Sequence, residues 1–290
     1  MKSPMHRRLG FSFLYFAPRL DVRHERWFGA LAQHGYHGAE VPVNEANDAD
    51  LAWLRRTLHT HGLGATAVGF AVAGANPLAA DAQERRAAVD HLGRLAEKTA
   101  SIGANLLAGP LHSAFGVFTE QPPTADERAR CIEVLHAAGE RAGRVGVRLA
   151  IEPLNRFESY FLNTAGDCDS LVRAVNHPSV VSALDTHHAH IEENDLIAAI
   201  HASVRSLSHV QLSENHRGTP GTGQVPFDRV LQALDEIGYD GWLVIEAFSR
   251  HEPDFANALR IWRPLDEGPD AVMAAGARIV GVKPRHRATH

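Results

Sequence analysis

Residues 124–152 read TADERARCIEVLHAAGERAGRVGVRLAIE, and this stretch contains one complete helix signal followed by one complete strand signal. Thr124 and Glu127 have the spacing of a capping box, which predicts that a helix begins at the next residue and covers Ala125–Val145. Gly146 lies where that helix should stop, because glycine readily adopts the left-handed conformation found after a helix end. The remaining residues form a mostly apolar run that closes on Glu152, as expected of a buried strand.

The same unit recurs along the chain. Short apolar runs bounded by turn residues predict eight strands: Leu9–Phe13, Gly38–Val41, Gly64–Phe70, Asn105–Gly109, Val147–Glu152, Val180–Asp185, Leu207–Ser213 and Trp242–Phe248. Their starts lie roughly 33 residues apart on average, and the gaps carry helical patterns such as Asp81–Ile102. Glycines mark further helix stops at 35, 62, 103 and 238. Eight strand-plus-helix units predict an α/β fold, the (β/α)₈ TIM barrel. The alternative is an open doubly wound sheet, but the GxGxxG motif that would favour it does not follow the first strand.

The two ends of the chain complete this organisation. Pro253–Trp262 is expected to form a last helix, and Gly268–Ile279 an extra C-terminal helix. We expect one catalytic domain over residues 1–282 and a short, basic, disordered tail over 283–290. Residues 5–17, basic and then apolar, could pass for a secretory signal, but without a small-residue cleavage site a first strand is the better interpretation.

Composition narrows the class of protein. The chain has 290 residues and 31.6 kDa, with 44% apolar and 22% charged residues, enough for one large core. Its 29 Lys and Arg against 34 Asp and Glu give a net charge of −5, mixed along the sequence, which argues against nucleic acid as a partner. Cys131 and Cys168 have no metal-binding or disulfide spacing. No run is long enough for a membrane span, so we expect a soluble, cytoplasmic protein.

Three of the last four predicted strands contain an apolar run that closes on a carboxylate, at Glu152, Asp185 and Glu246. In a barrel these positions lie at the C-terminal mouth, where the catalytic groups of this fold collect, so the three carboxylates should converge. Taken singly, each could be a salt-bridged strand end. A buried cluster of like charges persists only if something positive lies among them, and a divalent metal ion satisfies this requirement.

The seventh predicted strand should complete this site. His209, Gln211 and Ser213 alternate onto one face, and the middle residue lies at the height of a fourth ligand. Three carboxylates with an amide oxygen form a hard ligand set that favours Mn²⁺ or Mg²⁺ over zinc. On the second strand, Glu40 is either an acceptor behind this site or a packed strand-end carboxylate.

Several motifs of the sequence resemble the ketose 3-epimerases of the D-tagatose/D-psicose (allulose) type, within the sugar isomerase/epimerase branch of the xylose isomerase-like TIM barrels. The resemblance covers most of the chain and is closest from 147 to 250. The motifs that carry it are IEPLNRFE at 151–158, LNT at 162–164, LDTHH at 184–188, SENHRGTPGTG at 213–223 and GYDGWLVIE at 238–246.

The resemblance implies a set of metal ligands and an acid/base pair. Glu152, Asp185 and Glu246 match three ligands of one divalent metal, for which Mn²⁺ is expected and Mg²⁺ or Co²⁺ are alternatives. Glu152 and Glu246 also match the pair that works on the two faces of the reacting carbon. At the fourth ligand this chain has Gln211 where the epimerases have His, whereas the related hydroxypyruvate isomerases have Gln in a His-x-Gln strand.

The resemblance also implies how substrate is held. Glu158, His188 and Arg217 match residues that bind the oxygens at the reacting end of a ketose, and a homodimer or homotetramer is expected. Of the neighbouring histidines 187, 188 and 190, only His188 is expected to face the site. The glycine-rich run 218–223 lacks the Lys-Ser/Thr of a phosphate loop, so a free sugar fits better than a sugar phosphate.

The chemistry follows from the reacting carbon itself. Removal of a proton next to a ketone leaves an enediolate, which a divalent ion that chelates both oxygens stabilises. Two carboxylates on opposite faces then decide the outcome: a proton returned from the far side inverts the centre, whereas a proton returned to the neighbouring carbon gives an isomer. Together with the resemblance, this predicts epimerisation at carbon-3 of a free ketose. The alternatives are an aldose–ketose or hydroxypyruvate-type isomerase using the same metal, an endonuclease-like member of the superfamily, and a sugar-binding protein without turnover.

Overall fold

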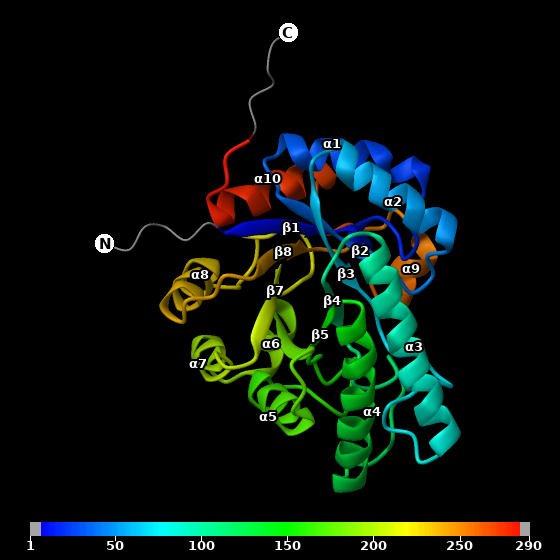
Figure 1. The fold of residues 1–290 in the computed structure, drawn as a ribbon. Helices are drawn as coiled ribbons and strands as arrows, with labels where there is room; N and C mark the ends of the chain where they lie inside the picture. The colour runs from blue at the N-terminus through cyan, green and yellow to red at the C-terminus, as the bar shows by residue number, and fades with distance from the viewer. Residues whose placement is uncertain (1–6, 285–290) are drawn as a thin grey trace.

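The computed structural model describes residues 7–284, and its eight parallel strands close into a barrel in sequence order, with helices around the outside (Figure 1). The strands are Arg8–Ser12 (β1), Gly38–Pro42 (β2), Gly64–Val68 (β3), Leu106–Gly109 (β4), Arg148–Ile151 (β5), Val180–Asp185 (β6), Leu207–Ser213 (β7) and Trp242–Glu246 (β8). The predicted TIM barrel is therefore confirmed, and the open doubly wound sheet is wrong.

The helices follow the strands in alternation. They are Glu25–Gln33 (α1), Asp48–Thr60 (α2), Ala82–Ser101 (α3), Ala125–Arg144 (α4), Ala165–Val175 (α5), Thr186–Glu192 (α6), Leu196–Ala202 (α7), Phe227–Glu236 (α8), Pro253–Ala258 (α9) and Pro269–Val280 (α10), with 3₁₀ turns at Phe13–Tyr15 (η1) and Val22–His24 (η2). The capping box of α4 is confirmed, since the Glu127 N–H donates to the Thr124 hydroxyl at 3.2 Å and the Thr124 N–H donates to the Glu127 carboxylate at 2.7 Å. The glycines predicted to stop helices all have positive φ.

One end of the barrel is closed by the Trp242 side chain. A Cβ at Gly38 would lie 2.6 Å from the Trp242 ring, and one at Gly64 would lie 3.2 Å from it, so only glycine leaves room for the indole here. The Arg8 guanidinium lies over that ring, 5.3 Å from its centroid. The N-terminal end of the barrel is thus filled, and polar groups can collect at the C-terminal end.

Some helices and strands are shorter than predicted. The helix expected over Pro253–Trp262 ends at Ala258, because Arg260 takes the left-handed conformation (φ 60°) and the N–H of Ile261 donates back to the Ala256 carbonyl at 2.8 Å. Four strands are also shorter than predicted: β4 begins one residue later, at Leu106, and β5 covers Arg148–Ile151 rather than Val147–Glu152. β3 ends at Val68 rather than Phe70, and β8 ends at Glu246 rather than Phe248.

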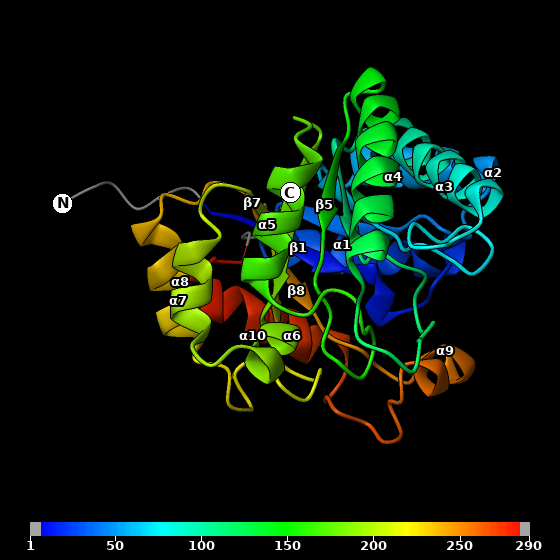
Figure 2. The same cartoon turned by 90° about the horizontal axis from the view of Figure 1, so that it is seen from below.

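The extra C-terminal helix is present as α10, and the hydroxyl of Tyr36 donates to its Met273 carbonyl at 2.9 Å. Cys131 and Cys168 are buried free thiols. Within residues 7–284 no helix is both long and apolar enough to cross a bilayer. Residues 285–290 of the predicted tail and residues 5 and 6 of the candidate signal region fall outside the described residues. The described part of that region contains β1, which confirms the first-strand interpretation. When the view is turned, α6 and α9 lie at the same end of the barrel, the end at which the strands terminate (Figure 2).

Candidate active site

The three predicted carboxylates lie at that end of the barrel. Glu152 directly follows β5, while Asp185 and Glu246 are the last residues of β6 and β8, and none is more than 4% exposed. Burial and the nearby Asp185 raise the pKa of Glu152 and of Glu246 well above the usual range, and Arg217 opposes this. Burial likewise raises the pKa of Asp185. Because Asp185 contributes to the raised pKa of both glutamates, the three carboxyls form one electrostatic unit.

Asp185 also begins the helix that follows it. Its Oδ1 accepts hydrogen bonds from the N–H groups of His187 (2.6 Å) and His188 (3.2 Å), which makes it the N-cap of α6. Its Oδ2 is buried and has no hydrogen-bond partner among the described residues. One carboxylate oxygen is therefore used by the fold, and the other remains free to bind.

Gln211 lies next to Asp185, since the two are paired in the β6–β7 ladder. Its Nε2 donates to Glu246 Oε1 at 3.1 Å and to Glu40 Oε1 at 3.0 Å. Its Oε1 is buried and, within the described part of the chain, unpartnered. A buried acceptor without a donor is costly, and a cation would satisfy both this oxygen and Oδ2 of Asp185. These residues fit a divalent ion that prefers oxygen ligands.

Arg217 brings a positive charge into the same region. It is 7% exposed, its guanidinium lies 4.7 Å from the Phe248 ring centroid, and its Nη2 lies 3.4 Å from Oε1 of Glu158. Burial alone would lower the pKa of Arg217, but Glu158 and Glu246 raise it, so the group stays charged. The sequence analysis expected a metal to supply the counter-charge of the cluster. In the structure Arg217 is a second source of positive charge, although one guanidinium does not balance all the carboxylates of the cluster.

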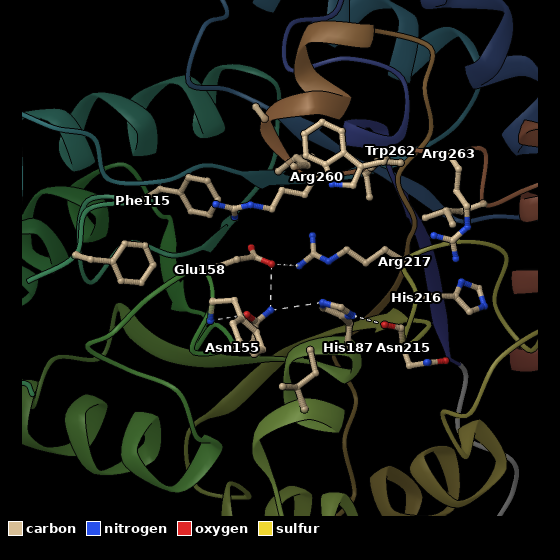
Figure 3. A pocket seen from close by; sticks show the side chains of 18 residues that line it. Phe115, Asn155, Glu158, His187, Asn215, His216, Arg217, Arg260, Trp262 and Arg263 are labelled. Atoms are coloured by element: carbon tan, nitrogen blue, oxygen red, sulfur yellow. Dashed lines mark hydrogen bonds and ion pairs between the residues drawn. The ribbon is translucent and has the colours of Figure 1, made fainter. Parts of the chain in front are cut away.

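Asn155 is a site residue that the sequence analysis missed. Its Nδ2 donates to Oε1 of Glu158 at 3.0 Å and lies 3.5 Å from Nε2 of His187 (Figure 3). The same Nδ2 lies 2.9 Å from Nδ1 of His188. Glu158, His187 and His188 also present ligand atoms within 4.8 Å of one another, so these three residues could hold a metal ion. The Asn155 amide, however, already donates into the middle of that group.

This amide distinguishes the two places where a metal could bind. At Glu158, His187 and His188 a metal would have to displace Asn155, whereas at Asp185 and Gln211 one acceptor oxygen each has no donor among residues 7–284. Asn155 belongs to the motif at 151–158, so the sequence did mark the segment that contains it as functional. Only the folded arrangement, which places α6 beside this loop, indicates what the amide does.

The positions of the histidines in α6 differ from the prediction that only His188 faces the site. His187 is also buried and lines the outer part of the cavity, with its Nδ1 2.9 Å from the Asn215 carbonyl. The reason is that both residues lie in the first turn of α6, directly over the barrel mouth. Burial and Arg217 lower the pKa of His187 to about 2 and that of His188 well below its usual range. Both rings are therefore neutral near pH 7.

Above the carboxylates lies a cavity of about 410 Å³. Glu152, Glu246, Glu158, His188 and Arg217 all line it. The rest of its lining is mostly apolar and includes Leu14, Phe70, Phe115, Phe248, Phe255 and Leu259. An outer cavity of about 440 Å³ adjoins it through Phe115, Glu158 and Arg217, and carries Trp262 at its rim (Figure 3). Glu45 is the further charged residue of the described lining, so the cavity combines a set of charged groups with a largely apolar wall.

Glu214 holds the loop that carries Arg217, and this role was also missed. Its Oε1 accepts from the N–H groups of Asn215, Gln224 and Val225, each at 3.0 Å, and its Oε2 accepts from Gly221 at 2.9 Å. Glu214 is fully buried. The loop therefore folds around a carboxylate, which helps to maintain the left-handed conformation of Arg217 (φ 62°).

Comparison with known proteins identifies the family. The family described as the xylose isomerase-like TIM barrel matches residues 28–265. The chain belongs to this family. It is 33% identical over 234 residues to a ketose 3-epimerase of Arthrobacter globiformis, covering 80% of each chain. It is 30% identical over 265 residues to a D-psicose 3-epimerase of Agrobacterium fabrum, covering 90% of this chain and 92% of the relative.

Solved structures agree with this assignment. The D-allulose 3-epimerase of Methylomonas sp. in complex with D-allulose superposes with a TM-score of 0.89 at 25% identity, covering 96% of this chain and 97% of that one. The resemblance to the xylose isomerase-like barrels that the motifs indicated is therefore confirmed.

Proposed function

We propose that this protein is a divalent-metal-dependent epimerase that inverts carbon-3 of a free ketose. The observation that carries the proposal is the placement of Glu152 and Glu246 on the floor of one cavity, beside Asp185 and Gln211 with their unpartnered buried oxygens. The relatives named ketose 3-epimerase and D-psicose 3-epimerase support the reaction class. The homo-oligomeric state and the cytoplasmic location stay predictions.

Glu152, Asp185, Gln211 and Glu246 would hold the ion. Their oxygen atoms favour Mn²⁺, with Mg²⁺ or Co²⁺ as alternatives. When bound, such an ion polarises the oxygens next to the reacting carbon, which makes the proton on that carbon easier to remove.

The proton itself is moved by Glu152 and Glu246. One carboxylate removes the proton from carbon-3 and the other returns a proton from the opposite face, so the two must begin in different protonation states. Their raised pKa values suit this exchange, because a carboxyl that titrates closer to neutral pH can serve as acid as well as base. The reverse reaction uses the same two groups in exchanged roles.

His188, Arg217 and Glu158 would bind the oxygens at the reacting end of the sugar. They are fixed before substrate arrives, through Asn155 and through the Glu158–Arg217 ion pair. The far end of the ketose would lie against the apolar side of the cavity, which offers little to distinguish one hydroxyl arrangement from another. Among the described lining residues of this cavity, Arg217 is the one Lys or Arg, which supports a free sugar over a sugar phosphate.

Turnover in D₂O tests the proposal. An epimerase that exchanges the proton through carboxylates should place deuterium at carbon-3 of the product, with inverted configuration and the ketone still at carbon-2. The Glu152→Gln and Glu246→Gln variants should each lose turnover, while one of them can still exchange the substrate proton, because removal needs one base. The assay uses several ketoses with Mn²⁺ added, and products are separated by chromatography.

The second candidate is an aldose–ketose or hydroxypyruvate-type isomerase. Gln211 favours this candidate, because the hydroxypyruvate isomerases, which the sequence resembles at this strand, also have Gln at the fourth ligand position. Such an isomerase moves the carbonyl to the chain end. Aldose as the main product, without deuterium at carbon-3, would replace the epimerase with this candidate.

A further inference from the structure

Glu40 lies in a buried hydrogen-bond network behind the carboxylate cluster. Its Oε1 accepts from Nε2 of Gln211 at 3.0 Å, while its Oε2 accepts from Nε2 of His209 at 2.7 Å and from the hydroxyl of Thr66 at 3.2 Å. None of these side chains is more than 1% exposed. Of the two interpretations that the sequence allowed for Glu40, the acceptor is therefore the correct one.

The network connects opposite parts of the barrel. Glu40 and Thr66 are paired neighbours on β2 and β3, whereas His209 and Gln211 belong to β7, about 170 residues later in the chain. The contact is made across the barrel interior. His209 and Thr66 together hold the Glu40 carboxyl group from the side that does not face Gln211.

Two carboxyl acceptors, Glu40 and Glu246, together set which way the Gln211 amide points, and Glu40 is the one of the two outside the predicted ligand set. A glutamine side chain has one accepting oxygen and one donating NH₂ group, and rotation by half a turn exchanges them. The Glu40 carboxyl accepts, so the NH₂ must point toward Glu40, where it also reaches Glu246 at 3.1 Å. The amide oxygen is thereby left on the other side, buried and unpartnered like Oδ2 of Asp185 on the neighbouring strand.

We propose that Glu40 is a positioning residue for the metal site, which holds the amide of Gln211 with its oxygen rather than its NH₂ toward the cation. The inference rests on the proposed function, because it requires a divalent ion at Glu152, Asp185, Gln211 and Glu246. An NH₂ group in that place would repel a cation and supply no lone pair. Groups behind metal ligands that fix their orientation typically contribute tenfold to hundredfold in metal affinity.

Mn²⁺ binding to the full-length protein, stripped of metal, tests this role. Free Mn²⁺ is followed by electron paramagnetic resonance during titration, so the readout does not depend on turnover. Glu40→Gln replaces one of the two acceptors of the Gln211 NH₂ with an amide that can also donate, which weakens the preference for one orientation, and Glu40→Asp withdraws the carboxyl by one methylene. Each variant should bind Mn²⁺ about tenfold to hundredfold more weakly than the unaltered protein. Having two variants guards against one that does not fold.

A swap separates positioning from general support of the fold. In the Glu40→Gln/Gln211→Glu double variant an amide at 40 can donate to a carboxylate at 211, whose other oxygen faces the metal, and the total charge is unchanged. This variant should recover the Mn²⁺ affinity that Glu40→Gln loses. Ser206→Ala is the matched control, because it removes a buried hydrogen bond to the Asp169 carboxylate (2.8 Å) away from the cluster.

The outcomes separate this inference from the proposed function. Unchanged Mn²⁺ affinity in Glu40→Gln and Glu40→Asp overturns the positioning role of Glu40 and leaves the metal site intact. An equal loss in Ser206→Ala, or a double variant no tighter than Glu40→Gln, overturns it as well. Failure of the unaltered protein to bind Mn²⁺ overturns both the metal site and the positioning role.

Discussion

Nη2 of Arg217 lies 2.8 Å from Nε2 of His188. Nδ1 of that ring accepts a hydrogen bond from the backbone N–H of Asn155 at 3.0 Å. Because burial and Arg217 hold the pKa of His188 well below its usual range, the ring is neutral. The Arg217 guanidinium can only donate, so these contacts hold the ring and the guanidinium against each other at the wall of the cavity, where both can bind a substrate.

Arg217→Ala should lower kcat/KM by similar factors on every ketose tested, because the lost contact is to atoms that the substrates share. A hydrogen bond from a charged group contributes about 1.5–3 kcal/mol, so the expected loss is about tenfold to hundredfold. Steady-state kinetics on at least three ketoses measures it. Arg55→Ala, an exposed change on α2, is the control. A large loss on one ketose and none on the others would contradict the placement of Arg217.

Exhaustive chelation should abolish turnover, and Mn²⁺, Mg²⁺ or Co²⁺ should restore it. The reason is that Arg217 alone cannot balance Glu152, Asp185 and Glu246, and that two buried oxygens beside them have no donor in the described structure. Activity is measured before chelation, after it and after each metal is added back. Full activity in protein shown by elemental analysis to be metal-free would remove the metal from the proposal.

Gln211→His should make metal affinity depend more steeply on pH below about 6.5, because imidazole must lose its proton before it binds a metal and an amide need not. Affinity falls as the pH drops through that value in the variant, and this added dependence should be missing from the unaltered protein. Mn²⁺ titrations at several pH values measure it. Identical pH profiles for the two proteins would mean that Gln211 is not a ligand.

The metal-free protein should lose stability as the pH rises above the ordinary pKa of glutamate. Burial raises the pKa of Glu152 and Glu246, so the folded state keeps protons that the unfolded state has already released. Stability then falls with rising pH, by at most about 1.4 kcal/mol per pH unit for each carboxyl, until the folded-state pKa is passed. Urea denaturation of chelated protein at pH 5 to 8 should show this slope. The Glu152→Gln/Glu246→Gln variant should show a flatter slope of stability against pH. Equal slopes in the two proteins would refute the raised pKa of these two glutamates.

Glu214→Ala should destabilise the fold by at least about 3 kcal/mol, since it leaves several buried N–H groups without an acceptor. Glu214→Gln, which keeps one acceptor oxygen, should lose less. Gly223→Ala tests the same loop from the other side, because a Cβ there would lie 2.6 Å from Oε1 of Glu214. Urea denaturation midpoints rank the three variants. Unchanged stability in Glu214→Ala would show that the loop does not depend on this carboxylate.

The sequence by itself predicted the features that are local. A helix start such as Thr124–Glu127 is set by hydrogen bonds between residues three apart, and a stop such as Gly146 by the backbone freedom of one residue. The strand ends at Asp185 and Glu246 follow from short apolar runs, and the repetition of these units indicated a barrel. Once a barrel is assumed, convergence of strand-end carboxylates follows from the symmetry of the fold.

Only the tertiary structure decided how the polar groups are paired. Glu40 and Gln211 are 171 residues apart, and nothing in either local sequence indicates that one orients the other. The same holds for Asn155, which meets His188 through a loop and a helix from different units, and for the premature end of α9 at Ala258. Hydrogen bonds act over about 3 Å, so their partners depend on side-chain positions that exist only after the barrel has closed.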